Sequence, residues 1–167
     1  MSFVRLIAVV ASIMLATAAS AQDVSSAELQ LNAIIAEAWA FELVEDPVAA
    51  TAAGVNDFND RMPSVTRDAQ LRRLAARQRF LARTRDLDRS AMSRDGRINA
   101  AVFEWVLEDL IGEAEVNLSR IPFNTFSGFF KNALDASSAI SMDDVADYEA
   151  YIARMRDIPR YFDENVD

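Results

Sequence analysis

The sequence predicts an all-α fold, an irregular helical bundle of about five to seven helices. Three observations predict it. The composition is globular, with 51% hydrophobic and 26% charged residues in a chain of 167. Only four Gly and four Pro residues occur, which favours long helices over turn-rich β structure. Apolar residues also recur at helical spacing along most of the chain.

The composition excludes several classes of function. The chain contains neither His nor Cys, so it lacks the commonest general base, the commonest metal ligand and any thiolate ligand. The formal net charge is −9, and phosphate contacts need clustered positive charge. We therefore expect no cofactor in this chain and no nucleic-acid partner.

Residues 1–21 resemble a secretory signal peptide. Arg5 supplies a basic start, residues 6–18 form an uncharged apolar run, and residues 19–21 are a small-x-small cleavage site. The run is short for a membrane span, which needs ~20 apolar residues. We expect residues 22–167 to be exported to the periplasm or beyond, without stable membrane insertion after cleavage. An uncleaved anchor is the alternative.

The first mature segment predicts two helices. Ser25 and Glu28 have the spacing of a capping box, in which each side chain accepts the other residue's backbone N–H. Apolar residues follow at helical spacing until Pro47, which ends this helix and can begin a short one over residues 48–53. Gly54 is expected to stop the short helix.

A third helix is expected from Thr66, as N-cap, over residues 67–87. Seven arginines lie between residues 72 and 89. A basic helix can bind nucleic acid or an anionic membrane. These arginines are scattered around the helix, so we favour pairing with the acids of the next helix.

Residues 93–118 form the longest helical pattern, and its apolar side chains fall on two sides. One side carries Ile98, Ala101, Val102, Trp105, Gly112 and Val116. The other carries Phe103, Leu107, Leu110, Ile111, Ala114 and Leu118. A helix that is apolar on two sides is normally packed between partners. We therefore expect it to be the hub of the bundle.

Acidic residues of this hub helix have two interpretations. Asp109 projects with one apolar side, so it is expected to pair with an Arg of residues 67–87, or else to be a perturbed acid in a cleft. Glu104, Glu108 and Glu115 share one strip and could coordinate a cation. A solvated face is the favoured interpretation.

The remaining segments are less regular. Four Phe residues surround a Ser-Gly pair after Pro122. These Phe residues can line a ligand cleft or fill the core under a loop. A short helix is expected over residues 126–134. A further helix is expected after Ser141. Pro159 is expected to interrupt this helix, with another starting at residue 160. The apolar stripe of the helix expected after Ser141 is Val145, Tyr148, Ile152 and Met155.

Three stretches resemble a known family. They are residues 39–54 (WAFELVEDPVAATAAG), 56–65 (NDFNDRMPSV) and 147–165 (DYEAYIARMRDIPRYFDEN). Their order and spacing are similar to the opening of the bacterial domain of unknown function 885 family. That resemblance implies an exported, largely helical protein of several hundred residues. It also implies likeness to zinc metallopeptidases with a His-Glu…Gly-His-His type motif further downstream.

No position of this chain matches that motif, so the resemblance assigns it no catalytic or metal residue. Zinc and a peptide substrate are implied only for a longer parent protein. The missing C-terminal remainder of that protein is the partner that the resemblance implies. The loop rich in Phe is the candidate wall of its substrate cleft. The candidate substrate-binding residues are Asn124, Phe126, Ser127, Gly128 and Phe129.

The sequence thus favours the N-terminal helical fragment of a larger, exported, all-helical protein resembling metal-dependent peptidases, with the chain cut inside a helix. An independent periplasmic helical binding or scaffold module is the alternative. A hydrolase that uses carboxylates alone is a third possibility. No spacing in the sequence identifies its pair of acids. We expect this chain alone to be inactive, and whether the parent protein is a zinc-dependent peptidase or hydrolase stays open.

Overall fold

The computed structural model describes residues 24–116, 128–135, 140 and 142–166. Its regular elements are all helices, which confirms the predicted all-α class and the range of five to seven helices. In chain order they are α2 (Ser26–Glu45), α3 (Pro47–Ala52), α4 (Arg67–Arg85), the 3₁₀ helix η1 (Arg89–Ala91), α5 (Arg94–Glu115), α6 (Phe129–Asp135) and α7 (Val145–Val166).

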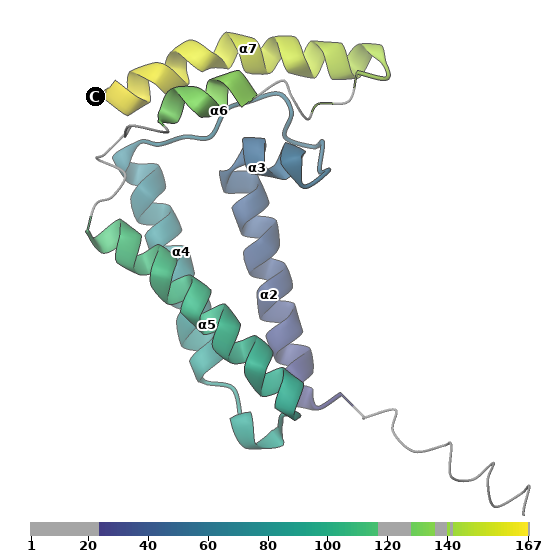
Figure 1. The fold of residues 1–167 in the computed structure, drawn as a ribbon, viewed down its shortest axis with the longest axis vertical. Helices are drawn as coiled ribbons and strands as arrows, with labels where there is room; N and C mark the ends of the chain where they lie inside the picture. The colour runs from purple at the N-terminus through teal and green to yellow at the C-terminus, as the bar shows by residue number, and fades with distance from the viewer. Residues whose placement is uncertain (1–23, 117–127, 136–139, 141, 167) are drawn as a thin grey trace, which may run out of the picture.

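The helices form two groups (Figure 1). Helices α2, α4 and α5 run alongside one another, and the α4–α5 contact is the most extensive. Helix α7 lies across one end of this group with α6 against it. The segment that joins α3 to α4 passes beneath α7, so it links the two groups.

Three apolar clusters stabilise this arrangement. The first lies where α2 meets η1 and α5, around Leu31 and Met92. The second joins α4 to α5 through Leu81, Leu107 and Ile111. The third holds α6 and α7 against the α3–α4 segment. It is made of Met62 and Tyr161, with Val48, Val65, Phe129, Ala133, Ile158 and Phe162 around them.

The predicted starts of α2, α4 and α5 are confirmed, whereas the predicted start of the short helix at residue 126 lies outside the described residues and α6 begins at Phe129. Ser25 and Glu28 form the complete capping box of α2: Ser25 Oγ accepts from Glu28 N at 3.2 Å, and Ser25 N donates to Glu28 Oε2 at 3.0 Å. Thr66 caps α4, and Ser93 caps α5. A short polar side chain before each helix satisfies a backbone N–H that has no partner within the helix.

The turn around Pro47 also follows the prediction. Asp46 ends α2 and begins α3, where its Oδ1 accepts from Ala49 N at 3.0 Å. Gly54 follows α3 with a φ of +82°, a conformation that strains residues with a Cβ. Helix α4 ends two residues before the predicted Leu87. Residues 117 and 118 of the predicted hub helix lie outside the described part of the chain.

The prediction for Pro159 is wrong, because α7 continues through it from Val145 to Val166. Proline removes one backbone hydrogen bond and usually breaks a helix. Here contacts to the rest of the fold hold the helix on both sides of the proline. Asp157 and Arg160 bind the α3–α4 segment, and Tyr161 is buried.

The predicted apolar stripe of α7 is present, but it lies on the exposed side of the helix. Val145, Tyr148, Ile152 and Met155 are exposed, whereas Arg154, Ile158, Tyr161 and Phe162 face the fold. The predicted start at Ser141 lies outside the described residues. The helix itself starts at Val145, and Asp144 Oδ1 accepts from Asp147 N at 3.0 Å.

Helix α5 is covered on one side only by the residues that the structure describes. Leu107 and Ile111 are buried against α4, but Ile98, Val102 and Trp105 are exposed. Within this part of the chain the hub contacts both α2 and α4, but through the same side, so its second apolar side is uncovered. In the described ranges no helix combines the length and the apolar character that a membrane crossing needs.

Candidate functional site

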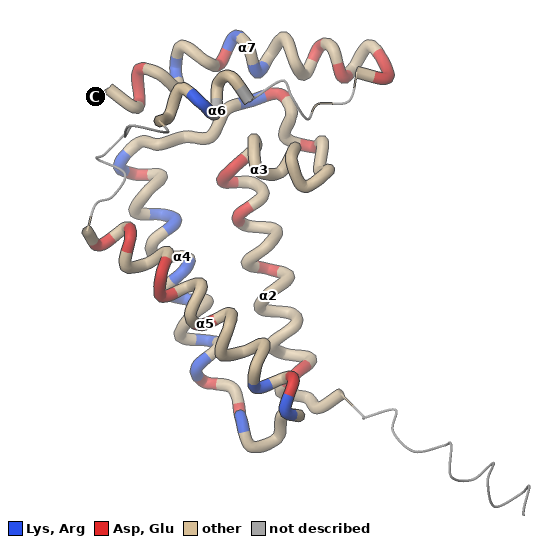
Figure 2. Tube along the Cα trace, viewed as in Figure 1, with Lys and Arg blue, Asp and Glu red and all other residues tan. Residues whose placement is uncertain are grey.

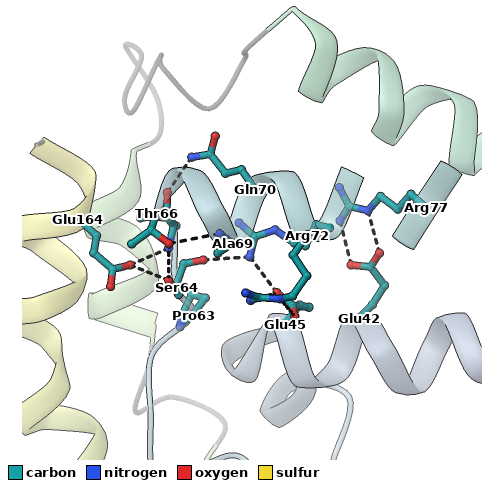
Figure 3. Close-up of polar contacts among 12 residues, drawn as sticks. Glu42, Glu45, Pro63, Ser64, Thr66, Ala69, Gln70, Arg72, Arg77 and Glu164 are labelled. Carbon is teal, nitrogen blue, oxygen red and sulfur yellow. Dashed lines mark hydrogen bonds and ion pairs between the residues drawn. The ribbon is translucent and has the colours of Figure 1, made fainter. Parts of the chain in front are cut away.

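The C-terminal helix is held to the α3–α4 segment by three side chains on one face of α7. Asp157 Oδ2 accepts from Met62 N at 2.8 Å, and Arg160 Nη2 donates to Met62 O at 3.0 Å. Glu164 Oε2 accepts from Val65 N at 2.8 Å and from Ser64 Oγ at 3.0 Å (Figure 3). These contacts satisfy backbone groups that no regular structure pairs.

Arg160 binds the two acids of this group as well as the backbone. Its Nη2 lies 2.7 Å from Asp157 Oδ2, and its Nη1 lies 2.6 Å from Glu164 Oε1. Hydrogen bonding to Arg160 lowers the pKa of Asp157, with a further contribution from Met62 N–H. Burial acts to raise the pKa of Glu164, but Arg160 and the groups at residues 64 and 65 outweigh it and lower that pKa.

A buried arginine lies on the inner side of α7. Arg154 is 0% exposed, and its Nη2 donates to Phe58 O and Thr51 Oγ1, both at 2.9 Å. It also reaches Pro47 O at 3.2 Å. Burial lowers the pKa of Arg154, because a charge is costly away from water. This guanidinium therefore holds α3 and the turn after it against α7.

A cleft of about 710 Å³ opens beside these contacts, between the end of α2, the α3–α4 segment and α7. Four acids and four arginines are among the fourteen lining residues, so the cleft is polar but nearly balanced in charge. Its lining consists of Val44, Glu45, Pro47, Asp60, Arg61, Met62, Pro63, Ser64, Arg72, Ala153, Arg156, Asp157, Arg160 and Glu164.

The arginines of α4 pair mainly with α2, not with α5 as the sequence predicts. Figure 2 shows blue residues along α4 and red ones along α2 and α5. Arg77 binds both carboxylate oxygens of Glu42, at 2.8 and 2.9 Å (Figure 3). Arg83 binds both oxygens of Glu37. Arg72 binds both oxygens of Glu45, and Arg73 binds one of them, Oε2.

The predicted pairing with the hub helix holds at two points. Arg85 binds Glu108 between α4 and α5, and Arg89 of η1 binds Glu104. The favoured interpretation of these acids as a purely solvated face is therefore incomplete. Asp109 is exposed and makes no ion pair with α4 among the described residues, so the expected pairing is wrong. Its interpretation as a perturbed acid in a cleft stays a prediction.

The outer side of α5 carries an apolar stripe. Its members are spaced by four and three residues, which keeps them on one side of a helix. Trp105 is 65% exposed and Val116 is 73% exposed. The stripe consists of Ile98, Val102, Trp105, Gly112 and Val116, with the exposed Asp109 among them. We call these residues the outer stripe of α5.

The predicted substrate-binding loop lies mostly outside the described residues, which exclude Asn124, Phe126 and Ser127. Gly128 and Phe129 are described and half-buried. Phe129 lies 5.0 Å from the Phe162 ring, centre to centre, and its carbonyl accepts from Tyr161 Oη at 3.2 Å. Phe129 thus contributes to the core between α6 and α7. The substrate-binding role of the loop stays a prediction.

Comparison with known families gives one decisive result. The family described as "Bacterial protein of unknown function (DUF885)" matches residues 47–167, from the start of α3 through α7. The chain belongs to the DUF885 family. The predicted resemblance is confirmed by this match. No curated protein matches the chain, and no solved structure matches it.

The DUF885 match covers the contacts that sequence reasoning missed. Arg154, Asp157, Arg160 and Glu164 all lie in the stretch 147–165 that carries the resemblance. The last three follow each other at intervals of three and four residues, so they share one helix face. That spacing was the signal for a polar contact surface, but it becomes visible only if Pro159 is allowed inside the helix.

The residues of this chain do not fit a zinc site. The sequence has no His or Cys, and the described residues contain no group of three acids placed to hold a metal ion. Zinc in peptidases is held mainly by His nitrogens, with a carboxylate or water completing the site. No residue of this chain is therefore assigned to zinc.

Proposed function

We propose that residues 22–167 are the N-terminal helical portion of an exported DUF885 protein, and that they support a catalytic part elsewhere in the same polypeptide. The observation that carries this proposal is the outer stripe of α5. The outer stripe would pack against a helix of the catalytic part, because side chains spaced by four and three residues fit between those of a second helix.

The energetics favour a covered stripe. Fully burying one Val, Ile or Leu side chain stabilises a protein by about 1.5–3 kcal/mol. Ile98, Val102 and Val116 each leave about half or more of that surface in water. Trp105 is larger and also exposed, and aromatic residues dominate the free energy of many interfaces. A stripe of this kind is typical of an interaction surface.

The reaction proposed for the parent protein is metal-dependent peptide hydrolysis. The support is the sequence resemblance of the family to zinc metallopeptidases. This chain would supply none of the metal ligands, because it has no His or Cys. Its role would be to position the catalytic part through the outer stripe of α5 and to border the substrate path with the loop that contains Asn124 and Phe126.

Export is the second part of the proposal. Its support is the basic residue, apolar run and small-x-small site within residues 1–21. Mass spectrometry of the protein purified from the periplasm tests two points at once, export and the presence of a catalytic part beyond residues 22–167. We expect an N-terminus at Gln22 and a mass well above that of residues 22–167. A cytoplasmic protein with an intact Met1 would contradict export.

Activity measurements complete this test. The periplasmic protein should hydrolyse peptides, lose that activity with a chelator and regain it with zinc. Residues 22–167 expressed alone should bind no zinc and cleave no peptide. Hydrolysis by this shorter chain would contradict the assigned role, because the catalytic groups would then lie within it.

An independent binding module remains the second candidate function, and the cleft beside α7 favours it. The cleft volume of about 710 Å³ is within the range of small-molecule sites, ~300–1,000 Å³. Its balanced charges would suit a zwitterionic ligand, such as an amino acid or a short peptide. Calorimetric titration with such ligands tests this, and Asp157→Asn should weaken binding.

A further inference from the structure

Helix α7 exposes a regular apolar seam on the side that faces away from the fold. Its members follow at spacings of three, four, three and four residues, the repeat by which two helices pack together. Val145 is 73% exposed, and Ile152 near the middle is 45% exposed. The seam consists of Val145, Tyr148, Ile152, Met155 and Pro159, all of them exposed.

The seam and the fold contacts use opposite sides of α7. Arg154 and Tyr161 are buried on the inner side, and Asp157 binds Met62 there. The helix also lies at the outer end of the molecule, across the ends of the longer helices (Figure 1). A partner could therefore cover the seam without disturbing any contact that holds α7 in place.

The charges beside the seam indicate which partner fits. Glu149 and Arg156 lie on the same flank, seven residues apart, which is two turns of helix. Both are exposed, and neither has a hydrogen bond or ion pair with a described residue. Arg156 lies between the seam and the cleft beside α7, which it also borders. Between Val145 and Pro159 this flank thus carries one negative group, Glu149, and one positive group, Arg156, and the point midway between them lies between residues 152 and 153.

We propose that α7 pairs with α7 of a second copy of this chain, in antiparallel orientation, about a two-fold axis beside Ile152. In that arrangement Glu149 of one copy lies opposite Arg156 of the other, and the symmetry produces this ion pair twice. The two seams then cover one another. A closed, self-complementary contact of this kind is the commonest route to a homodimer.

The seam is long enough for a specific contact. It contains fifteen residues from Val145 to Pro159, and the fourteen steps between them cover roughly 21 Å at 1.5 Å per residue. The partner is a second copy because the seam supplies both members of each ion pair itself. A different helix would need its own acid and base at the matching positions. This inference does not depend on the outer stripe of α5, which lies on another helix.

Charge reversal tests the pairing. The purified chain should sediment as a dimer that dissociates on dilution. Glu149→Arg alone and Arg156→Glu alone should each weaken the dimer at least about tenfold, because each places like charges opposite one another twice. The combination Glu149→Arg with Arg156→Glu should restore the dimer. A double variant that stays as weak as the single variants would overturn the proposal.

Two matched controls separate this surface from others. Ile152→Glu should abolish the dimer, whereas Val102→Glu, on the outer stripe of α5, should leave it intact. The far-ultraviolet circular dichroism of both variants should match that of the parent chain. A monomer at every concentration, or a dimer lost through Val102→Glu but kept in Ile152→Glu, would contradict pairing through α7.

Cross-linking tests the orientation, since the chain has no Cys of its own. In the antiparallel pair the two copies of residue 152 lie side by side. Ile152→Cys should therefore be joined efficiently by a short bifunctional maleimide. The two copies of residue 145 lie roughly 22 Å apart along the axis, at 1.5 Å per residue. Val145→Cys should not be joined, and efficient joining there would exclude the antiparallel arrangement.

Discussion

Ser93 and Glu28 lie 65 residues apart in the chain, yet Ser93 Oγ donates to Glu28 Oε1 over 2.5 Å. Ser93 caps α5 and Glu28 belongs to the capping box of α2. One carboxylate therefore serves the starts of two helices. A negative charge is favourable there because the N-termini of both helices carry partial positive charge. This contact fixes where α5 begins relative to α2.

Gly96 is expected to be essential to that junction. A Cβ at this position would lie 2.7 Å from Glu28 Cγ, so Glu28 would have to move away from Ser93. We expect Gly96→Ala to destabilise the fold by about 1–2 kcal/mol through overpacking. Urea unfolding measures this change in free energy.

Gly112 in the same helix is the matched control. A Cβ there meets nothing within 4 Å. Gly112→Ala should therefore stabilise the fold by about 0.5–1 kcal/mol, because Ala loses less backbone freedom in a helix. If both substitutions changed stability by the same amount in the same direction, the close approach at Gly96 would not be the cause.

The carboxylates at the helix junctions predict acid sensitivity. The pKa of Glu28 is lowered by its bonds to Ser93 and Ser25, and the pKa of Asp157 is lowered chiefly by Arg160. A lowered folded-state pKa means that the stabilising effect is complete above the unfolded value and is lost as pH falls through the folded one. Stability should therefore fall below the ordinary values of 4.5 for Glu and 3.8 for Asp.

Urea unfolding at a series of pH values measures this dependence. Glu28→Gln should lower the free energy of unfolding at neutral pH. It should also make the plot of that free energy against pH less steep below pH 4.5, since one group with a lowered pKa is removed. An unchanged slope in this variant would show that other carboxylates account for the loss.

Arg154 is expected to be the most sensitive polar position in α7. Arg154→Met keeps much of the volume but leaves Phe58 O and Thr51 Oγ1 without this donor. The loss of these hydrogen bonds by buried groups should lower the free energy of unfolding by about 2–4 kcal/mol in total. The rate of backbone amide hydrogen exchange should rise in the turn after α3. Arg79→Met on α4 is the control, because Arg79 is exposed and a surface substitution changes little.

The ion pairs between α2 and α4 should differ in strength according to their burial. Arg77 and Glu42 are 15% and 32% exposed, and both hydrogen bonds of the pair are short. A double-mutant cycle with Ala should give a coupling energy of about 0.5–1 kcal/mol for this pair. The cycle for Arg83 and Glu37, which are more exposed, should give a clearly smaller value. Equal values would show that burial does not decide the strength.

Local signals in the sequence predicted the helix boundaries well. Ser25 with Glu28, Thr66 and Ser93 act through neighbouring backbone groups, so their spacing alone is informative. The position of α3 followed from Pro47 and Gly54 for the same reason. Such features depend on a few adjacent residues and not on the rest of the fold.

Features that depend on distant residues were predicted poorly. Pro159 lies inside α7 because contacts from Asp157, Arg160 and Tyr161 hold the helix, and these involve residues some hundred positions earlier. The apolar stripe of α7 follows from periodicity, but periodicity does not show which side of a helix the fold covers. The buried face of α7 instead contains Arg154, a residue type that is rarely buried.

The candidate site was only partly predictable. The family resemblance located residues 147–165, and the polar contacts of α7 lie there. The pairing of α4 with α2 was missed because the arginines surround α4, and only the packing decides which acids they meet. The cleft could not be predicted at all, since three segments far apart in the sequence line it.

The measurement that tests the central claim most directly is hydroxyl-radical footprinting of Trp105, with oxidation of the peptide that contains Trp105 measured by mass spectrometry. It compares residues 22–167, in which Trp105 is 65% exposed, with the protein purified from the periplasm. We predict strong oxidation of Trp105 in the shorter chain and clear protection in the periplasmic protein, where the remaining part of the polypeptide covers the outer stripe of α5. Equal oxidation of Trp105 in the two proteins would contradict this account.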